Sequence, residues 1–372
     1  MPSIDADSHF MEPFDILQRY TEPAFRDRAM RIERDAGTGE LAMVVDERPL
    51  RFLDLEALLG AVVGYGQKEA GRDLSSFESY TQENPQWQDM ERRVRFLDEE
   101  GFDKQVIYPS LGLIWEGGTR DPELVAALCR AYNTWAFELT SDYRDRLYPA
   151  AHISLRNVKL AVEEIRRVVK LGARTIFVAA MPVDRKSLGH PELDPVWAEA
   201  EANEMAVSLH LVGHSQYTGH QYYTDRDPGF MFITMNVIQD PRMALTTMVY
   251  DGVFDRFPRL RVGTIEAMAG WVGEWMERLS YRFGYMQKTS RMKRHPREYF
   301  DENIWICGDP EEKMFPLVVQ FMGDEKFFFG SDYPHAEGFV HPVETMTKLL
   351  ADLPQHSFER IMHVNAQNFF RF

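Results

Sequence analysis

The residues of this sequence best suited to chemistry are acidic residues and histidines at the ends of short apolar segments. Asp7 and His9 lie two residues apart in Asp-Ala-Asp-Ser-His, so on an extended strand both side chains leave the same face. His210 and Glu266 each end a later apolar segment, and Asp332 follows another. Carboxylates and imidazoles are the ligands that a borderline or hard divalent cation takes. The pattern indicates a metal site, although on this spacing alone Asp7 could be a turn residue and His9 a capping residue.

Further histidines stand close to these positions. His335 comes three residues after Asp332, and His214 comes four residues after His210. Both are candidates for substrate contact or acid–base catalysis. His152 ends the third apolar segment, and its side chain could face either the interior of the sheet or the surrounding helices.

The apolar segments belong to a repeating pattern of strands and helices. Eight of them alternate with stretches of helical period; they are 3–7, 104–109, 147–152, 174–178, 206–210, 261–266, 303–307 and 326–330. Strands that are apolar throughout and separated by helices are typical of a parallel sheet covered on both faces. Eight repeats favour closure into a (β/α)8 TIM barrel, in which the carboxyl ends of all strands meet at one mouth.

Helix boundaries follow from local signals. The stretch 158–171 places its apolar residues on one face, and Gly172 follows it as a stop signal. Asp-Pro pairs at 121–122, 194–195, 240–241 and 309–310 each precede a helical pattern. An Asp at the N-cap and a Pro at the first helical position predict that a helix begins at each pair.

Two long connections interrupt the repeats without dividing the chain. We interpret residues 1–372 as a single barrel domain with an insertion at about 20–90, between the first two strands. Its part 33–51 has the pattern of a hairpin, and the glycine-rich part 59–84 that of a lid. A second long loop lies within 211–260. Loops at the mouth of a barrel usually shape the substrate pocket, and the residues Phe10, Trp115 and Tyr222 in such loops indicate an apolar or aromatic substrate.

Composition excludes several classes of partner. The 58 acidic and 42 basic residues give a formal net charge of −16, which argues against nucleic acid or anionic lipid as a partner. The two cysteines lack the spacing of a disulfide framework or a zinc site. Neither a signal peptide nor a membrane-spanning run is recognisable. We therefore expect a cytoplasmic protein that acts on a small molecule.

Three motifs relate the chain to a known family. They are Ile-Asp-Ala-Asp-Ser-His-Phe-Met-Glu-Pro at the N-terminus, Val-Ser-Leu-His at 207–210 and Phe-Gly-Ser-Asp-Tyr-Pro-His-Ala-Glu-Gly at 329–338. With these motifs the sequence resembles the amidohydrolase superfamily, in the branch that includes aminocarboxymuconate-semialdehyde decarboxylase and γ-resorcylate decarboxylase. The resemblance implies that Asp7, His9, His210 and Asp332 are metal ligands and that Asp332 is also the general base.

Two departures from the family pattern bear on the metal and the chemistry. Asp7 replaces a ligand that is usually histidine, and the added negative charge favours Mn or Fe beside Zn. Glu266 stands where many relatives carry a catalytic histidine. No lysine ends the fourth strand segment, so a binuclear centre built on a modified lysine is not expected. One divalent ion is expected, and Glu266 leaves room for a second.

Three functions compete on these observations. The favoured one is a metal-dependent hydrolase of an ester, thioester, lactone or amide, because the sixth-strand histidine is missing. The alternative is non-oxidative decarboxylation of an aromatic or unsaturated carboxylic acid, with Glu266 as proton donor. A barrel that only binds a ligand is disfavoured, since all four principal ligand positions are occupied. We also expect a homodimer, because the helix at 267–286 and the C-terminal Phe-Phe-Arg-Phe would expose apolar groups.

Overall fold

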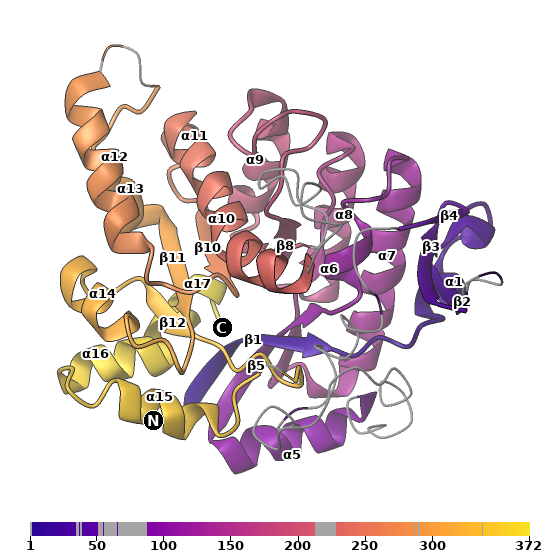
Figure 1. Ribbon diagram of the computed structural model, residues 1–372, viewed down its shortest axis with the longest axis horizontal. Helices are drawn as coiled ribbons and strands as arrows, with labels where there is room; N and C mark the ends of the chain where they lie inside the picture. Colours follow the sequence, from indigo (N-terminus) through magenta and orange to yellow (C-terminus); the bar gives the residue numbers. More distant parts are fainter. Residues whose placement is uncertain are drawn as a thin grey trace.

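The centre of the molecule is a set of parallel strands. The computed structural model describes residues 2–34, 37, 39–50, 55, 65, 88–212, 228–286, 288, 291–336 and 338–372. In this part of the chain the parallel strands are β1 (Ser3–Phe10), β5 (Phe102–Pro109), β6 (Leu147–Pro149), β7 (Ala151–His152), β8 (Thr175–Ala179), β9 (Ala206–His210), β10 (Arg261–Ile265), β11 (Ile304–Gly308) and β12 (Phe327–Phe329). Helices surround them (Figure 1). The eight predicted strand segments all coincide with these strands.

Hydrogen bonds join the strands into a ring. One sheet has the order β1-β5-β6, and the other has the order β12-β11-β10-β9-β8-β7. Only Ala150 separates β6 from β7, so the two together form the third strand. At the other seam, the main-chain N–H groups of Ser331 and Asp332 donate to Asp7 O (3.0 and 2.9 Å), and His9 N donates to Tyr333 O (2.7 Å). The fold is therefore a (β/α)8 barrel, as predicted.

The outer layer consists of helices that pack their apolar faces on the strands. The longer ones are α5 (Met90–Glu100), α7 (Pro122–Leu139), α8 (Val158–Leu171), α9 (Asp194–Ala202), α10 (Pro228–Tyr250), α12 (Val272–Met286), α13 (Pro296–Asn303), α14 (Phe315–Met322) and α15 (Pro342–Leu349). The short helices are α1 (Ile16–Tyr20), α6 (Gly112–Trp115), α11 (Val253–Arg256), α16 (Gln355–Glu359) and α17 (Asn365–Phe370). Helix α8 has the predicted bounds, and Gly172 at its end has the left-handed conformation (φ 96°).

Helices begin at two of the four Asp-Pro pairs, as predicted. Asp121 accepts from the main-chain N–H groups of Glu123 and Leu124 at the start of α7. Helix α9 begins at Asp194, although Leu193 is its N-cap residue and Asp194 pairs with Arg256. Pro241 lies within α10 and Pro310 in the loop before α14. The prediction is wrong at the last two pairs, because α10 begins earlier, at Pro228, and α14 begins later, at Phe315.

The bottom of the barrel is closed by the C-terminal residues. Phe369 and Phe370 are completely buried, and their rings contact Trp305 and Phe328 inside the barrel. A Cβ on Gly263 would lie 2.7 Å from the Phe369 ring, so the strand needs glycine there. The expectation that these phenylalanines are exposed is wrong, because they complete the core.

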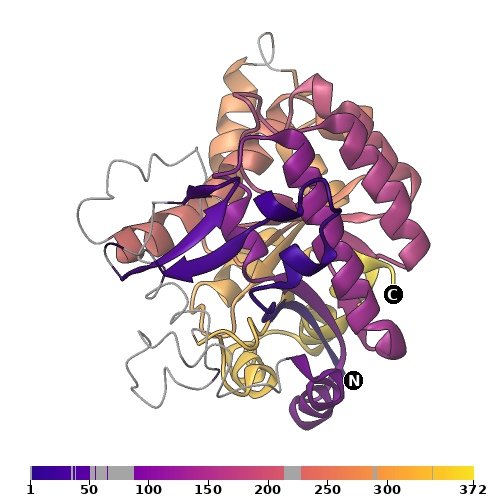
Figure 2. The ribbon, with the colours of Figure 1, turned by 90° about the vertical axis from the view of Figure 1, so that its right-hand side faces the viewer.

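The insertion after β1 contains the predicted hairpin. Strands β2 (Arg31–Arg34), β3 (Leu41–Val45) and β4 (Arg48–Pro49) pair antiparallel, and Figure 2 shows them beside the barrel. The predicted lid at 59–84 lies outside the described residues except for Tyr65. Among the described helices, none is long and apolar enough to cross a membrane. The single-domain division and the cytoplasmic location stay predictions.

Candidate metal centre

Strand β1 delivers two of the predicted ligands from one face. Asp7 and His9 are buried, and Asp7 Oδ1 lies 3.5 Å from His9 Nε2. Both side chains enter the barrel because the residues are two positions apart on an extended strand. His9 Nδ1 lies 3.0 Å from the carbonyl oxygen of Pro109, at the end of neighbouring strand β5. Since a carbonyl can only accept, Nδ1 carries the proton and the Nε2 lone pair faces the interior.

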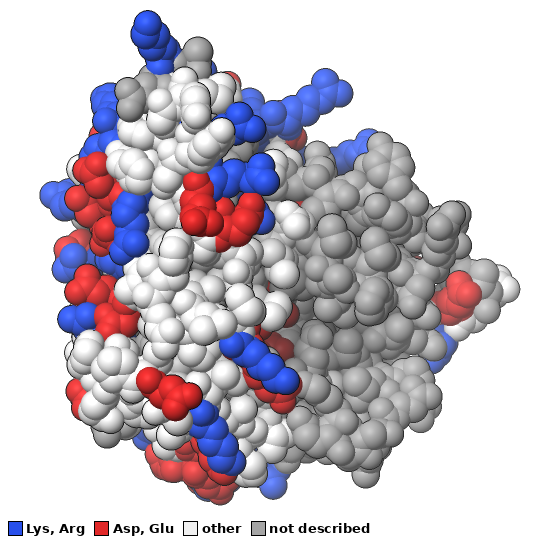
Figure 3. Space-filling model, turned by 60° about the vertical axis from the view of Figure 1, so that its left-hand side comes forward, with Lys and Arg blue, Asp and Glu red and all other residues white. Residues whose placement is uncertain are grey.

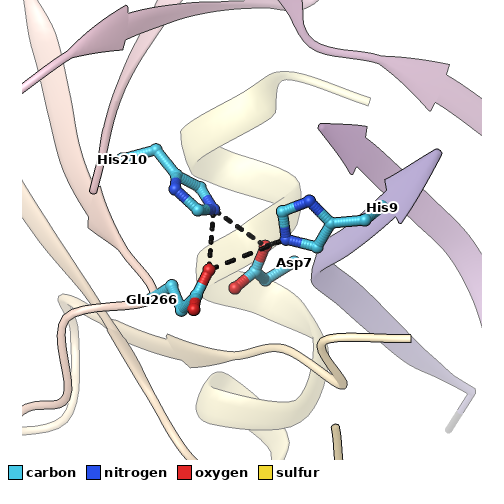
Figure 4. A group of neighbouring side chains, drawn as sticks. All are labelled: Asp7, His9, His210 and Glu266. Carbon is cyan, nitrogen blue, oxygen red and sulfur yellow. Dashed lines mark ion pairs between the residues drawn. The ribbon is translucent and has the colours of Figure 1, made fainter. Parts of the chain in front are cut away.

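His210 and Glu266 come from adjacent strands. The register of β9 and β10 places Ile265 opposite His210, so Glu266 follows directly beside the imidazole. His210 Nε2 lies 3.2 Å from Glu266 Oε2 and 3.7 Å from Asp7 Oδ1, while Glu266 Oε2 lies 3.7 Å from His9 Nε2. His210 Nδ1 faces the carbonyl oxygen of Leu211 at 3.2 Å, so its Nε2 also presents a lone pair. Figure 4 shows the four side chains pointing toward one another.

Asp332 lies on the other side of His9. Its Oδ1 is 3.3 Å from His9 Nε2 and 2.8 Å from His335 Nδ1. Asp332 and Glu266 both have left-handed backbone conformations, with φ 54° and φ 47°. Such residues are uncommon outside glycine and concentrate at functional sites. The chain turns sharply at both strand ends, and each carboxylate comes to the mouth of the barrel.

The arrangement fits a divalent cation. One donor atom each from Asp7, His9, His210 and Glu266 lies within 4.8 Å of the others. Asp7 Oδ1, His9 Nε2 and His210 Nε2 are buried and have no hydrogen-bond partner among the described residues. Burying such atoms without a partner costs roughly 1–3 kcal/mol each. A cation with ligand distances of about 2.0–2.2 Å would satisfy all of them.

The protonation states are those that ligands need. Burial alone raises the pKa of Asp7, but the neighbouring His210 and His9 outweigh it and lower the pKa to about 2. Burial lowers the pKa of His9 below its ordinary value. At neutral pH the carboxylate of Asp7 is therefore ionised and the imidazole of His9 is neutral.

His335 packs against His9 at the metal centre. Its ring stacks on His9 with the centroids 4.0 Å apart, and its Nε2 lies 2.7 Å from Ser110 Oγ. Burial holds the pKa of His335 well below its ordinary value, so the ring is neutral. Ser110 Oγ donates its only hydrogen to a main-chain carbonyl oxygen, so the neutral ring of His335 donates from Nε2 to Ser110 and its Nδ1 faces Asp332 with a lone pair. His214, the other predicted catalytic histidine, lies outside the described residues.

Two neighbouring predictions have different outcomes. His152 does not reach the metal cluster, because its Nε2 forms a buried pair with Glu116 Oε2 at 2.7 Å. The sequence did not indicate Glu116 as a partner, because Glu116 follows the short helix α6 and does not stand at the end of a strand. Phe10 and Trp115, expected to line a substrate pocket, are packed in the core against Trp135 and His152 respectively.

Comparison with known proteins places the whole barrel in one group. Residues 4–372 match the family model described as Amidohydrolase. The sequence is 24% identical over 288 residues to 2-amino-3-carboxymuconate-6-semialdehyde decarboxylase of Dictyostelium discoideum, covering 76% of each chain. The fold is similar to a crystal structure of an amidohydrolase from Mycobacterium avium subsp. paratuberculosis K-10, with a TM-score of 0.82, 25% identity and 99% of each chain covered.

A second similar structure is that of a decarboxylase with bound manganese. Dihydroxybenzoic acid decarboxylase from Polaromonas sp. JS666, with bound manganese and the inhibitor 2-nitroresorcinol, matches with a TM-score of 0.67 and 16% identity. The match covers 100% of this chain and 97% of that one. The expected hydrolase activity is contradicted by these findings, because the relatives named for a reaction are decarboxylases. The absence of a sixth-strand histidine was not a sound reason to favour hydrolysis.

Proposed function

Because the chain belongs to the amidohydrolase family, we propose that it is a metal-dependent carboxy-lyase acting on a small aromatic or unsaturated carboxylic acid. The observation that carries the proposal is the convergence of Asp7, His9, His210 and Glu266 within 4.8 Å at the mouth of the barrel. The choice of decarboxylation rests on the named reactions of the relatives.

The proposed ion is manganese, held by Asp7, His9, His210 and Glu266, with Asp332 beside His9 as a fifth ligand. A donor set of three carboxylates and two imidazoles is rich in hard oxygen ligands, which suits Mn²⁺ better than a thiolate-rich set would. A structural relative contains manganese. When bound, the ion supplies positive charge that holds the substrate carboxylate and an adjacent oxygen atom.

The side chains have to manage one proton. Cleavage of the bond to the carboxyl group releases CO2 and leaves its electron pair on carbon, which then takes up a proton. The Glu266 side chain is 18% exposed, whereas those of Asp7, His9 and His210 are 4% exposed or less. Glu266 is therefore the member of this group nearest the open mouth. Its Oε2 faces His9 and His210, so we assign to its Oε1 the uptake of a proton from solvent and the delivery of that proton to carbon.

Asp332 and His335 form the second proton-carrying group. Their 2.8 Å contact and the contact of His335 with Ser110 link the mouth to a buried hydroxyl. In the proposal, Asp332 accepts a proton from an acidic group of the substrate, and the unprotonated Nδ1 of His335 lies beside that carboxylate to receive it.

The proposal is tested with acids of both classes. The purified protein is supplied with Mn, Fe or Zn and incubated with hydroxybenzoates and with unsaturated dicarboxylic acids. We expect CO2 release with one of them and, in D2O, one deuterium on the carbon that lost the carboxyl group. His210→Ala, prepared identically, is the control. A fully Mn-loaded protein that releases no CO2 from either class contradicts the proposal.

We further propose a homodimer built on the outer face of α12 and α14. Tyr281, Tyr285, Leu317 and Phe321 are all more than half exposed on these helices. Figure 3 shows this side of the molecule, where a broad uncharged area separates groups of charged side chains. Large apolar side chains exposed on neighbouring helices are typical of protein interfaces. Light scattering at micromolar concentration should give twice the monomer mass, and Phe321→Glu should shift it toward the monomer.

A further inference from the structure

The turn that carries Glu266 is strained twice within three residues. Glu266 and Met268 both have left-handed backbone conformations, with φ 47° and φ 52°. Each such residue costs about 1–3 kcal/mol and persists only when its surroundings hold it. If the turn relaxed, the Glu266 carboxylate would leave its position 3.2 Å from His210 Nε2.

Glu312 holds this turn from the neighbouring loop. It lies between β11 and α14 and is 4% exposed. Its Oε1 and Oε2 accept from Ala269 N at 2.9 and 2.8 Å, and Gly270 N also donates to Oε1. A Cβ on Gly270 would lie 3.0 Å from Oε1, so glycine allows the close approach.

Trp271 holds the same turn from its other side. Its indole N–H donates to the carbonyl oxygens of Ala267 and Met268, at 2.9 and 3.0 Å. Glu312 thus binds the N–H groups of the turn and Trp271 binds its carbonyl groups. All four contacted residues follow directly after Glu266.

We propose that Glu312 is a positioning residue of the metal centre and acts through Glu266. By binding Ala269 and Gly270 it keeps the left-handed turn in place, and the turn keeps the Glu266 carboxylate beside His9 and His210. This inference rests on the proposed metal-binding function. A plain helix cap is the competing role, since Ala269 and Gly270 immediately precede α12 and a carboxylate there also stabilises the helix.

A double-mutant cycle separates these roles. Mn²⁺ affinity is measured by titration calorimetry on Glu312→Gln, Glu266→Gln and the double variant. Partners that orient a ligand are worth about 10–100-fold in metal affinity, so Glu312→Gln should weaken binding by about 10-fold. In the Glu266→Gln background the same change should have less than about a 2-fold effect, because the ligand it positions has lost its charge.

Glu12→Gln is the matched control. Glu12 is also a buried carboxylate that accepts from main-chain N–H groups, those of Ser110, Leu111 and Gly112, but it holds the loop after β5. Its effect on Mn²⁺ affinity should be the same in both backgrounds. If Glu312→Gln does not fold, Trp271→Phe removes the other contact with the turn and takes its place in the cycle.

The outcomes are distinguishable. Equal weakening by Glu312→Gln in both backgrounds, or a lower melting temperature with unchanged Mn²⁺ affinity, would overturn the positioning role and leave a helix cap. A wild-type protein that binds no Mn²⁺ would instead refute the proposed function.

Discussion

Two buried clusters of histidine and carboxylate stand at the mouth of this barrel, and they are built for different purposes. In the metal centre, the distances from His9 and His210 Nε2 to Asp7 and Glu266 are 3.2–3.7 Å. At the third strand, His152 Nε2 contacts Glu116 Oε2 at 2.7 Å. The first spacing leaves room for a cation, whereas the second is a direct hydrogen bond.

The two clusters also differ in which ring nitrogen forms a hydrogen bond. In His9 and His210, Nδ1 faces a carbonyl oxygen, so Nε2 is left to act as a ligand. In His152, Nε2 is already taken by Glu116, and the main chain of His152 is held on both sides by the Asn133 amide. Residue type and strand-end position are thus insufficient to define a ligand. His152 Nδ1 also lacks a hydrogen-bond partner among the described residues, so what decides is whether the free nitrogen lies beside other ligand atoms, as Nε2 of His9 and His210 does.

The most direct test of the difference between the two clusters is to remove one histidine from each. His210→Ala should abolish Mn²⁺ binding and lower turnover by at least about 10³-fold, because the ion contributes several kcal/mol to the transition state. His152→Ala should still bind one Mn²⁺ per chain. Metal content by mass spectrometry and CO2 release measure both. Loss of Mn²⁺ from the His152 variant would show that the two clusters are one site.

Asp332→Asn tests the part of the metal centre assigned to proton transfer. The amide keeps much of the shape and one oxygen atom, so some Mn²⁺ binding should remain. The proton acceptor is lost, and turnover should fall by about 10²–10⁴-fold, the usual contribution of a positioned base. Turnover and Mn²⁺ content are measured on the same preparation. Full activity in this variant would remove Asp332 from the mechanism.

The sequence could predict the barrel and the positions from which its candidate ligands come. Asp7 and His9 share a strand face by their spacing, and a strand of apolar residues followed by a polar one is visible in the chain itself. The partners of those residues are not. Whether His152 meets Glu116 or the metal centre depends on how α6 packs over the third strand, and Glu312 reaches the turn after Glu266 only because β10 and β11 are neighbours.

The reaction class could not be predicted from the sequence for a related reason. Glu266 in place of histidine changes which group can carry a proton, but the sequence does not show that the same residue lies 3.2 Å from His210. The reaction class came from named relatives rather than from the residues themselves.

The His152–Glu116 pair should contribute to folding and not to metal binding. Removing one partner of a buried pair leaves the other without compensation and costs about 3–5 kcal/mol. Glu116→Ala should lower the free energy of unfolding in urea by about this amount while Mn²⁺ affinity stays within about 2-fold. Replacing both residues, in His152→Phe with Glu116→Leu, should cost less than either single change. A stable Glu116→Ala variant with weakened Mn²⁺ binding would contradict this.

A weaker effect is expected in the pH dependence of the unfolding free energy. In acid the two clusters lose stability for different reasons. Burial by itself raises the pKa of Glu116, but the hydrogen bond from His152 and the nearby charge of Arg156 lower it, and the net pKa lies below the ordinary 4.5. A carboxyl group with a lowered pKa in the folded state stabilises the fold above its unfolded value, and this contribution is lost as the pH falls through the folded value. The difference in unfolding free energy between wild type and Glu116→Gln should therefore be constant down to about pH 5 and shrink below about pH 4.5.

The measurement is made in EDTA, so that only the pair contributes. With Mn²⁺ present, acid should cause a further loss of stability as protons compete for the metal ligands, and Glu116→Gln should keep that loss unchanged. If the clusters are separate, the two losses of stability in acid are independent of each other. If instead wild type and Glu116→Gln stay parallel to about pH 3.5 in EDTA, the hydrogen bond from His152 does not hold the carboxylate in its ionised form, which its 2.7 Å distance would otherwise indicate.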